Sequence, residues 1–319
     1  MPNMNLNACN LCPRVCGVDR TRGKTGVCGM PDTLYISRCA PHLWEEPPIS
    51  GVRGSGTVFF TGCNLRCVFC QNRTISREGV GHPVTTEELE QAILNLQEQG
   101  VHNVNLVTPT HYTVQIARVL EKIKPRLQIP VVWNSSGYES VEALRMVEGL
   151  VDVYLPDFKY RSSELSAAYS SAPDYADRAT EAVSEMFRQV GKYREQDGLA
   201  TRGLIVRHLV LPGCRADSMA VLRHLSEILP PADIRVSIMR QYTPDFAMDC
   251  PHKNLRRRVT EFEYTSVLDE AVRLGLNGFS QGKDAADKVF TPDFESYQSQ
   301  NIEWEGGPPA EFKGVFENP

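Results

Sequence analysis

Short apolar stretches alternate with amphipathic helical stretches six times between residue 57 and about residue 280. Strands that alternate with helices in this way build a parallel sheet through right-handed crossovers. Six such units are too few to close an eight-stranded barrel. The sequence therefore predicts an α/β fold, a partial (β/α)6 TIM-like barrel with strands near 57–61, 104–107, 129–134, 151–155, 204–211 and 234–238.

The residues that follow these strands are unusually polar. In a barrel of this kind the active site lies at the C-terminal ends of the strands. We therefore expect a site built from Thr108 and Thr110 after the second strand, Asp157 and Lys159 after the fourth, Arg207 on the fifth, and Tyr242 after the sixth. Because an arginine is costly to bury unpaired, Arg207 is expected to meet an anion.

Three cysteines, Cys63, Cys67 and Cys70, directly follow the first strand. Three thiolates can bind three irons of a [4Fe-4S] cluster and leave the fourth iron open for a bound molecule. A closed structural metal site instead takes four protein ligands. The spacing favours an open, catalytic cluster, and the alternatives are a tight loop of buried thiols or part of a zinc knuckle.

A second group of cysteines, Cys9, Cys12, Cys16 and Cys28, precedes the barrel. Four thiolates make a closed site, either structural zinc or an auxiliary [4Fe-4S] cluster. The spacing does not distinguish the two metals. The three remaining cysteines, Cys39, Cys214 and Cys250, have no partners in sequence and are expected to be inert thiols.

The composition suggests three parts. Residues 1–50 are expected to form a small cysteine-rich metal module followed by a proline-rich connector, in which Pro41, Pro47 and Pro48 disfavour a regular helix. Residues 51–285 form the predicted barrel. Residues 286–319 are rich in proline, glycine and glutamate and are expected to form an extended C-terminal tail.

Charge and hydropathy argue against two classes of partner. The net charge of −5 gives no electrostatic reason to expect a nucleic acid, and no stretch approaches the ~20 apolar residues of a membrane span. The N-terminus lacks the features of a signal peptide, so we expect a cytoplasmic protein with reduced thiols. An oxygen-sensitive cluster further suggests an anaerobic cell.

The cysteine loop, with Phe69 just before the last cysteine, resembles the signature of the radical SAM enzymes. Further segments resemble the pyruvate formate-lyase activating enzyme and, more closely, a little-characterised branch of activating-enzyme-like proteins. These segments are residues 44–48, 54–57, 71–72, 108–112, 154–160 and 207–213. The resemblance covers nearly the whole chain from residue 9 to about residue 280.

The resemblance implies that the open iron chelates S-adenosylmethionine and that its reductive cleavage yields a 5′-deoxyadenosyl radical. Cys63, Cys67 and Cys70 would bind the cluster, and the matching loop continues through Gln71 and Asn72. Among the cofactor-binding residues implied, Phe69 would lie near the adenine, Asp157 would take the ribose hydroxyls, and Lys159 would face the methionine carboxylate. An electron donor such as flavodoxin or ferredoxin is the implied partner.

Two segments depart from the family pattern. The usual glycine-rich, glutamate-containing segment that holds the methionine amino group is replaced by residues 108–111, where Thr108 and Thr110 offer oxygen atoms instead. The histidine expected after the sixth strand is replaced by Gln241 or Tyr242. A tyrosine near a radical could relay a hydrogen atom, whereas the alternative is a packed tyrosine with a satisfied hydroxyl.

The leading interpretation is therefore a radical SAM oxidoreductase that abstracts hydrogen. One candidate substrate is a glycine of a partner glycyl radical enzyme, and the other is a small molecule or a peptide. A non-catalytic iron–sulfur electron carrier is the alternative from a different class.

Overall fold

The computed structural model describes residues 5–282, 285, 292, 294, 315 and 316. Its centre is one sheet in the order β11-β10-β9-β8-β6-β5-β4-β2-β1-β3, with β7 paired to β8 off this path. The strands are β1 (Leu34–His42), β2 (Ser55–Phe60), β3 (His82–Val84), β4 (Val104–Val107), β5 (Val131–Ser135), β6 (Val153–Pro156), β7 (Arg194–Gln196), β8 (Leu199–Leu209), β9 (Arg235–Met239), β10 (Gly278–Ser280) and β11 (Val315–Phe316).

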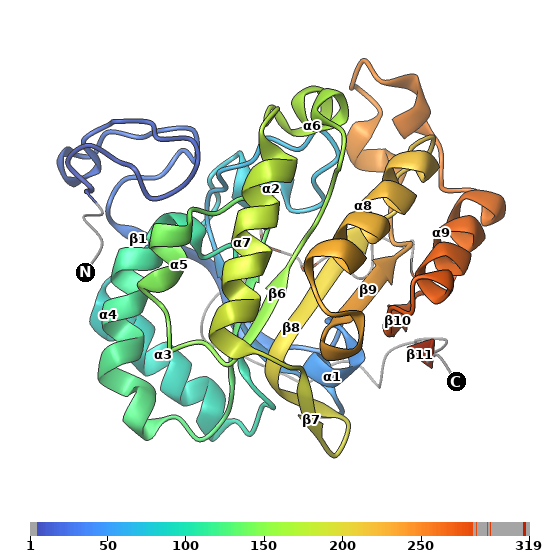
Figure 1. The fold of residues 1–319 in the computed structure, drawn as a ribbon. Helices are drawn as coiled ribbons and strands as arrows, with labels where there is room; N and C mark the ends of the chain where they lie inside the picture. The colour runs from blue at the N-terminus through green and yellow to red at the C-terminus, as the bar shows by residue number, and fades with distance from the viewer. Residues whose placement is uncertain (1–4, 283–284, 286–291, 293, 295–314, 317–319) are drawn as a thin grey trace.

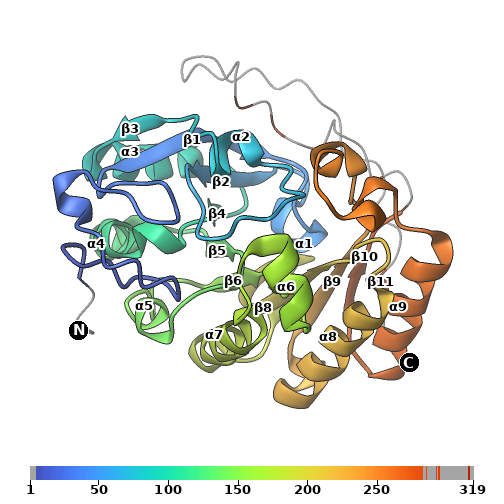
Figure 2. The ribbon, with the colours of Figure 1, turned by 90° about the horizontal axis from the view of Figure 1, so that it is seen from above.

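Helices cover the outer face of this sheet. Figure 2 shows the strands in an open arc with α4, α5, α7, α8 and α9 along its outer side. The helices are α1 (Pro47–Ser50), α2 (Arg73–Ser76), α3 (Thr86–Glu98), α4 (Thr113–Ile123), α5 (Val141–Arg145), α6 (Ser163–Ser170), α7 (Tyr175–Val190), α8 (Arg215–Ile228) and α9 (Glu261–Arg273). The predicted partial barrel is confirmed.

The six predicted strands correspond to β2, β4, β5, β6, β8 and β9, which run parallel to one another in the sheet. The parallel run continues into β10, which was not predicted. Three residues, Gly278–Ser280, are too few to carry a strand pattern in the sequence. Helix α3 begins at Thr86 with a capping box, in which Thr85 and Glu88 bind each other's backbone N–H groups.

The segment before the barrel differs from the expected connector. β1 pairs antiparallel with β2, with Ala40 opposite Thr57, so this segment extends the sheet. The expectation that the prolines exclude a helix is wrong at Pro47 and Pro48, which begin the one-turn helix α1. Proline is tolerated there because the first turn of a helix has no intrahelical partners for its N–H groups.

Helix α1 lies at the N-terminal ends of the parallel strands, beside β8 (Figure 1). Its Ile49 is fully buried in an apolar cluster with side chains from inside the sheet, among them Val132, Val153 and Ile205. This cluster fills one end of the barrel. The polar side chains at the opposite end can therefore line a pocket that opens only toward the C-terminal ends of the strands.

Two sequence expectations concern the rest of the molecule. Within the described residues no helix is long and apolar enough to cross a lipid bilayer. The predicted tail, residues 286–319, lies almost entirely outside the described residues. The exceptions are Pro292, Phe294 and the two residues of β11, and the ring of Phe294 packs edge-on against Phe59 with the ring centroids 5.3 Å apart.

Candidate functional site

The cysteine loop leaves β2 and brings its three sulfurs into one neighbourhood. Burial, reinforced by the nearby Cys67 thiol, raises the pKa of Cys63 to about 12. The backbone N–H of Leu65 donates to Cys63 Sγ over 3.4 Å, and the Ser170 hydroxyl donates to Cys67 Sγ over 3.0 Å. The Cys67 thiol is thus buried, those of Cys63 and Cys70 are half-buried, and each sulfur has a hydrogen-bond partner, which for Cys70 is the Ser76 hydroxyl at 3.4 Å.

Three thiols on one loop suit the chemistry of a [4Fe-4S] cluster. Across the part of the chain that the structure describes, no group of three or more histidine, cysteine, aspartate or glutamate side chains could hold one metal ion. A cubane cluster needs no such convergence, because each thiolate binds a separate iron. The thiols are also free of disulfides. Cys63, Cys67 and Cys70 thus fit three ligands of a [4Fe-4S] cluster.

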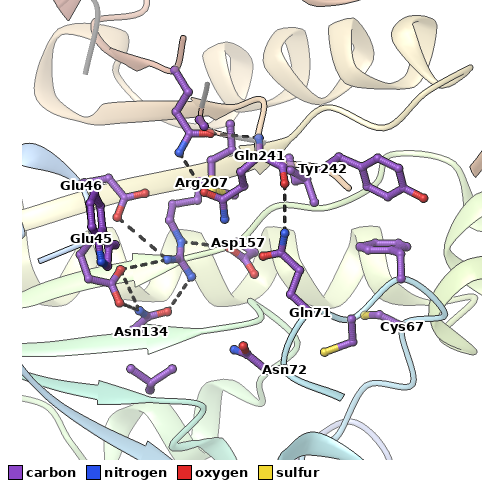
Figure 3. A pocket seen from close by; sticks show the side chains of 18 of the residues that line it. Glu45, Glu46, Cys67, Gln71, Asn72, Asn134, Asp157, Arg207, Gln241 and Tyr242 are labelled. Carbon is purple, nitrogen blue, oxygen red and sulfur yellow. Dashed lines mark hydrogen bonds and ion pairs between the residues drawn. The ribbon is translucent and has the colours of Figure 1, made fainter. Parts of the chain in front are cut away.

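A pocket extends from the cysteine loop into the barrel (Figure 3). Its walls come from the cysteine loop, from the inner face of the strands and from the segment between β1 and α1. Of the residues predicted from sequence, the pocket is lined by Cys67, Phe69, Cys70, Asn72, Asp157, Lys159, Arg207 and Tyr242. The structure thus brings together side chains that are up to 175 residues apart in sequence, from Cys67 to Tyr242.

Asp157 connects the pocket's two cations. It follows β6 and forms a parallel bridge with Arg207 of β8. Arg207 Nε donates to Asp157 Oδ1 over 3.0 Å, and Lys159 Nζ donates to Asp157 Oδ2 over 2.5 Å. Although burial alone would raise the pKa of Asp157, the charges of Arg207 and Lys159 hold it below its ordinary value. Asp157 is therefore an ionised carboxylate in a fixed orientation.

Lys159 links this carboxylate to the cysteine loop. Burial opposes its charge, but Asp157 and the Cys67 thiol raise the pKa of Lys159 above its ordinary value. The ammonium group therefore remains charged within the pocket, close to the sulfurs. A bound anionic group beside the cysteine loop would find a cation ready to pair with it.

The inner end of the pocket is rich in carboxylates. Arg207 Nη1 lies 3.3 Å from Glu45 Oε2 and 3.9 Å from Glu46 Oε2, and its Nη2 donates to Asn134 Oδ1 over 2.6 Å (Figure 3). Burial and the neighbouring Glu46 raise the pKa of Glu45 to about 7, against the attraction of Arg207. Glu46 Oε2 is buried without a hydrogen-bond partner. Three carboxylates thus share two cations.

Glu45 and Glu46 were part of the family resemblance, but their place in the pocket could not be predicted. They reach it because β1 runs antiparallel to β2 and returns the chain to the N-terminal ends of the strands, where α1 begins. The only signal in the sequence was a pair of glutamates directly before two prolines. Gln281 was also missed, and its side chain accepts from the backbone N–H groups of Arg240 and Gln241 over 2.8 and 3.1 Å.

Thr108 and Thr110 are not among the pocket-lining residues. Thr110 is buried and donates to Glu139 Oε1 over 3.0 Å, on a carboxylate that also accepts from Trp133 Nε1. Thr108 lies directly after Val107, which does line the pocket, and has φ of 60°. This conformation is uncommon for a β-branched residue, and such strain often accompanies functional sites.

The aromatic residues of the pocket pack together. The rings of Phe69 and Tyr242 meet edge to face with centroids 6.0 Å apart. The hydroxyl of Tyr242 donates to the carbonyl of Leu255 and points away from the pocket (Figure 3). Its side chain therefore has the features of the packed, satisfied tyrosine. Gln71 Nε2 donates to the carbonyl of Gln241 over 3.0 Å and joins the cysteine loop to the segment after β9.

The four N-terminal cysteines lie outside this pocket, in an irregular segment that packs against the cysteine loop. Arg14 Nε donates to the carbonyl of Asn64 over 2.8 Å, and Arg66 donates to the carbonyl of Val27 over 2.6 Å. Both contacts involve residues between Cys63 and Cys67.

Comparison with known proteins gives two sequence matches. The model of the Radical SAM superfamily matches residues 57–191. The uncharacterized protein MJ0674 of Methanocaldococcus jannaschii is 31% identical over 281 residues, which cover 84% of this chain and 76% of that protein.

Solved structures are similar at lower identity. SuiB of Streptococcus suis, bound to the precursor peptide SuiA, has a TM-score of 0.50 and 14% identity, covering 70% of this chain and 47% of SuiB. Methylornithine synthase (PylB) has a TM-score of 0.46 and 17% identity, covering 80% of this chain and 75% of that one. The chain spans about half the length of SuiB. At this identity, the likeness to SuiB shows a shared fold.

The variant Glu45→Gln tests the raised pKa of Glu45 beside Arg207 and Glu46. Because the pKa of Glu45 is raised to about 7, the folded chain keeps a proton there that the unfolded chain releases from about pH 4.5 upward. Its contribution to stability is present below about pH 4.5 and is lost as the pH rises to about 7. We expect the free energy of unfolding of the natural chain, relative to that of Glu45→Gln, to fall between about pH 4.5 and about pH 7 in urea titrations.

The matched control is Glu98→Gln, at an exposed position of α3. This variant should follow the natural chain at every pH. A difference between Glu45→Gln and the natural chain that does not change with pH would contradict the raised pKa.

Proposed function

The chain belongs to the radical SAM superfamily, and from this premise we propose that it cleaves S-adenosylmethionine reductively at a [4Fe-4S] cluster bound by Cys63, Cys67 and Cys70. When bound, the cluster supplies one electron to the sulfonium, which releases methionine and a 5′-deoxyadenosyl radical that abstracts a hydrogen atom. The observation that carries the proposal is the ion-paired group of Asp157, Lys159 and Arg207 beside these thiols.

Asp157, Lys159 and Phe69 each suit one part of S-adenosylmethionine. The carboxylate of Asp157 can accept from the two ribose hydroxyls, because it is held ionised by its cations. The ammonium of Lys159 can pair with the methionine carboxylate. The ring of Phe69 offers an apolar surface for the adenine at the wall of the pocket. The fixed geometry of the network lowers the entropic cost of orienting the cofactor.

The direct test is cleavage by the reconstituted chain. With iron and sulfide loaded anaerobically, dithionite and S-adenosylmethionine should yield 5′-deoxyadenosine and methionine in equal amounts. Cys67→Ala should abolish both products because it removes one of three cluster ligands. Cys39→Ala, a cysteine of β1 outside the pocket, is the control and should retain activity. Absence of both products from a chain with a full cluster would refute the proposal.

For the substrate, we propose the α-hydrogen of a glycine on a partner glycyl radical enzyme. The support is the resemblance of Asp157, Lys159 and Arg207 to the activating enzymes. A second candidate is a small molecule with a cationic group, favoured by the excess of carboxylates around Arg207. A buried carboxylate oxygen without a hydrogen-bond partner, such as Glu46 Oε2, is costly unless a donor reaches it. An ammonium or guanidinium group would supply that donor.

One pair of assays separates the two substrates. The first candidate predicts a stable glycyl radical EPR signal in a co-expressed partner enzyme after treatment with the reduced chain and S-adenosylmethionine. The second predicts that amines or guanidines, but not their neutral isosteres, raise 5′-deoxyadenosine formation above the rate without substrate, and that Glu46→Gln weakens this effect. A glycyl radical without any response to amines would exclude the second candidate. The opposite result would exclude the first.

A further inference from the structure

The irregular segment of residues 5–31 carries four cysteines that the proposed cleavage reaction does not use. Its only regular element is the 3-10 turn η1 (Arg20–Arg22). The apolar cluster beneath it is small and consists of Cys9 and Leu11 packed on Val114 of α4. A short irregular segment with so little apolar core usually needs a disulfide or a metal to fix its conformation. The cysteines form no disulfides, and a bound metal is one means by which four thiols fix such a segment.

The backbone of this segment folds the cysteines toward one another. The N–H of Gly17 donates to the carbonyl of Cys9 over 3.0 Å, and the N–H of Val15 donates to the carbonyl of Cys12, also over 3.0 Å. Val15 has φ of 40° and is largely exposed, although a β-branched residue is strained in this conformation. No burial of its own side chain compensates for this strain. The tight turn between Cys12 and Cys16 therefore holds Val15 in a strained conformation.

The second half of the segment closes over Cys16. A Cβ atom on Gly26 would lie 2.7 Å from Cys16 Sγ, so only glycine allows the chain to pass so close to this sulfur. The next residue, Val27, donates its N–H to Cys16 Sγ over 3.4 Å. The chain then reaches Cys28. Backbone N–H groups directed at sulfur are typical of iron–sulfur ligands, whose thiolates they stabilise.

The four thiols lie near enough to act on one another. The side chain of Cys12 lies close to those of Cys16 and Cys28, and the side chain of Cys28 also lies close to that of Cys9. Yet these sulfurs belong to no group that could hold one metal ion, within the ranges that the structure describes. Tetrahedral zinc requires all four sulfurs within about 2.3 Å of one point, whereas a cubane separates its ligands over four irons.

We propose that Cys9, Cys12, Cys16 and Cys28 bind a second [4Fe-4S] cluster that is closed by four protein thiolates. The two cysteine groups share the same features: buried or half-buried thiols that lie close together, a backbone N–H donated to one sulfur over 3.4 Å, and no convergence on a single ion within the described residues. Because every iron of this cluster has a protein ligand, it has no position for S-adenosylmethionine. Its possible roles are electron transfer and support of the neighbouring loop.

The second site lies directly against the first. A Cβ atom on Gly62, the residue before Cys63, would lie 2.8 Å from the carbonyl oxygen of Cys28. The hydrogen bonds from Arg14 to Asn64 and from Arg66 to Val27 join the two cysteine segments on both sides of this contact. A cluster bound by the N-terminal cysteines would therefore hold the catalytic loop in place.

The test measures metal rather than activity, so it is independent of the proposed cleavage reaction. The Cys63→Ala, Cys67→Ala, Cys70→Ala triple variant, reconstituted anaerobically, should contain about four irons and about four sulfides per chain. After reduction it should give an EPR signal that S-adenosylmethionine does not change. The natural chain should contain about eight irons, and S-adenosylmethionine should alter only part of its signal.

The complementary variant, Cys9→Ala with Cys12→Ala, should lose about half of the iron and keep the part of the signal that responds to S-adenosylmethionine. Cys39→Ala should keep the iron content of the natural chain. About four irons per natural chain, with about one zinc or no second metal, would overturn the proposal even if the triple variant failed to fold.

Discussion

Arg207 is the side chain on which the geometry of the pocket depends. It lies on β8, within the barrel, and joins Asp157 after β6, Asn134 of β5 and Glu45 before α1. Removing one partner of such a buried group typically costs about 3–5 kcal/mol, because the remaining charges stay buried without compensation. The arginine therefore requires three strands and the N-terminal segment to keep one arrangement. It also keeps Asp157 ionised, on which the proposed contact with the ribose depends.

The rest of the fold positions this arginine and the cysteine loop at the two ends of one pocket. The apolar cluster around Ile49 fills the base of the barrel. The charged side chains of Glu45, Asp157 and Arg207 therefore lie between this apolar cluster and the open end of the pocket. Lys159 donates a hydrogen bond to Asp157 and lies close to the thiol of Cys67, so it links the ion pair of Asp157 and Arg207 to the sulfurs. On the other side, the segment of residues 5–31 packs against the cysteine loop. The loop thus lies between the charged residues of the pocket and the N-terminal segment, and the segment is joined to it by hydrogen bonds.

Much of this arrangement could be predicted from the sequence because its signals are local. Apolar strand patterns, the capping box of Thr85 and Glu88, and the spacing of Cys63, Cys67 and Cys70 each lie within a few residues. The parallel topology then required the polar strand ends to meet, and eight of the predicted residues do line the pocket.

What could not be predicted depends on pairing over long distances in sequence. Glu45 and Glu46 enter the pocket only because β1 pairs antiparallel with β2. Thr110, like Asp157, is a polar residue that follows a parallel strand, but its hydroxyl donates a hydrogen bond to Glu139 outside the pocket lining. No local pattern distinguishes these two outcomes, because a polar residue at a strand end can face either the pocket or a buried partner.

The central claim is that the iron left open by Cys63, Cys67 and Cys70 faces the pocket and chelates S-adenosylmethionine there. Electron–nuclear double resonance on the reduced chain, with 15N in the amino group and 17O in the carboxylate of S-adenosylmethionine, measures this directly. The account predicts hyperfine coupling of both nuclei to the cluster. A fully loaded cluster with S-adenosylmethionine bound and no coupling to either nucleus would contradict it.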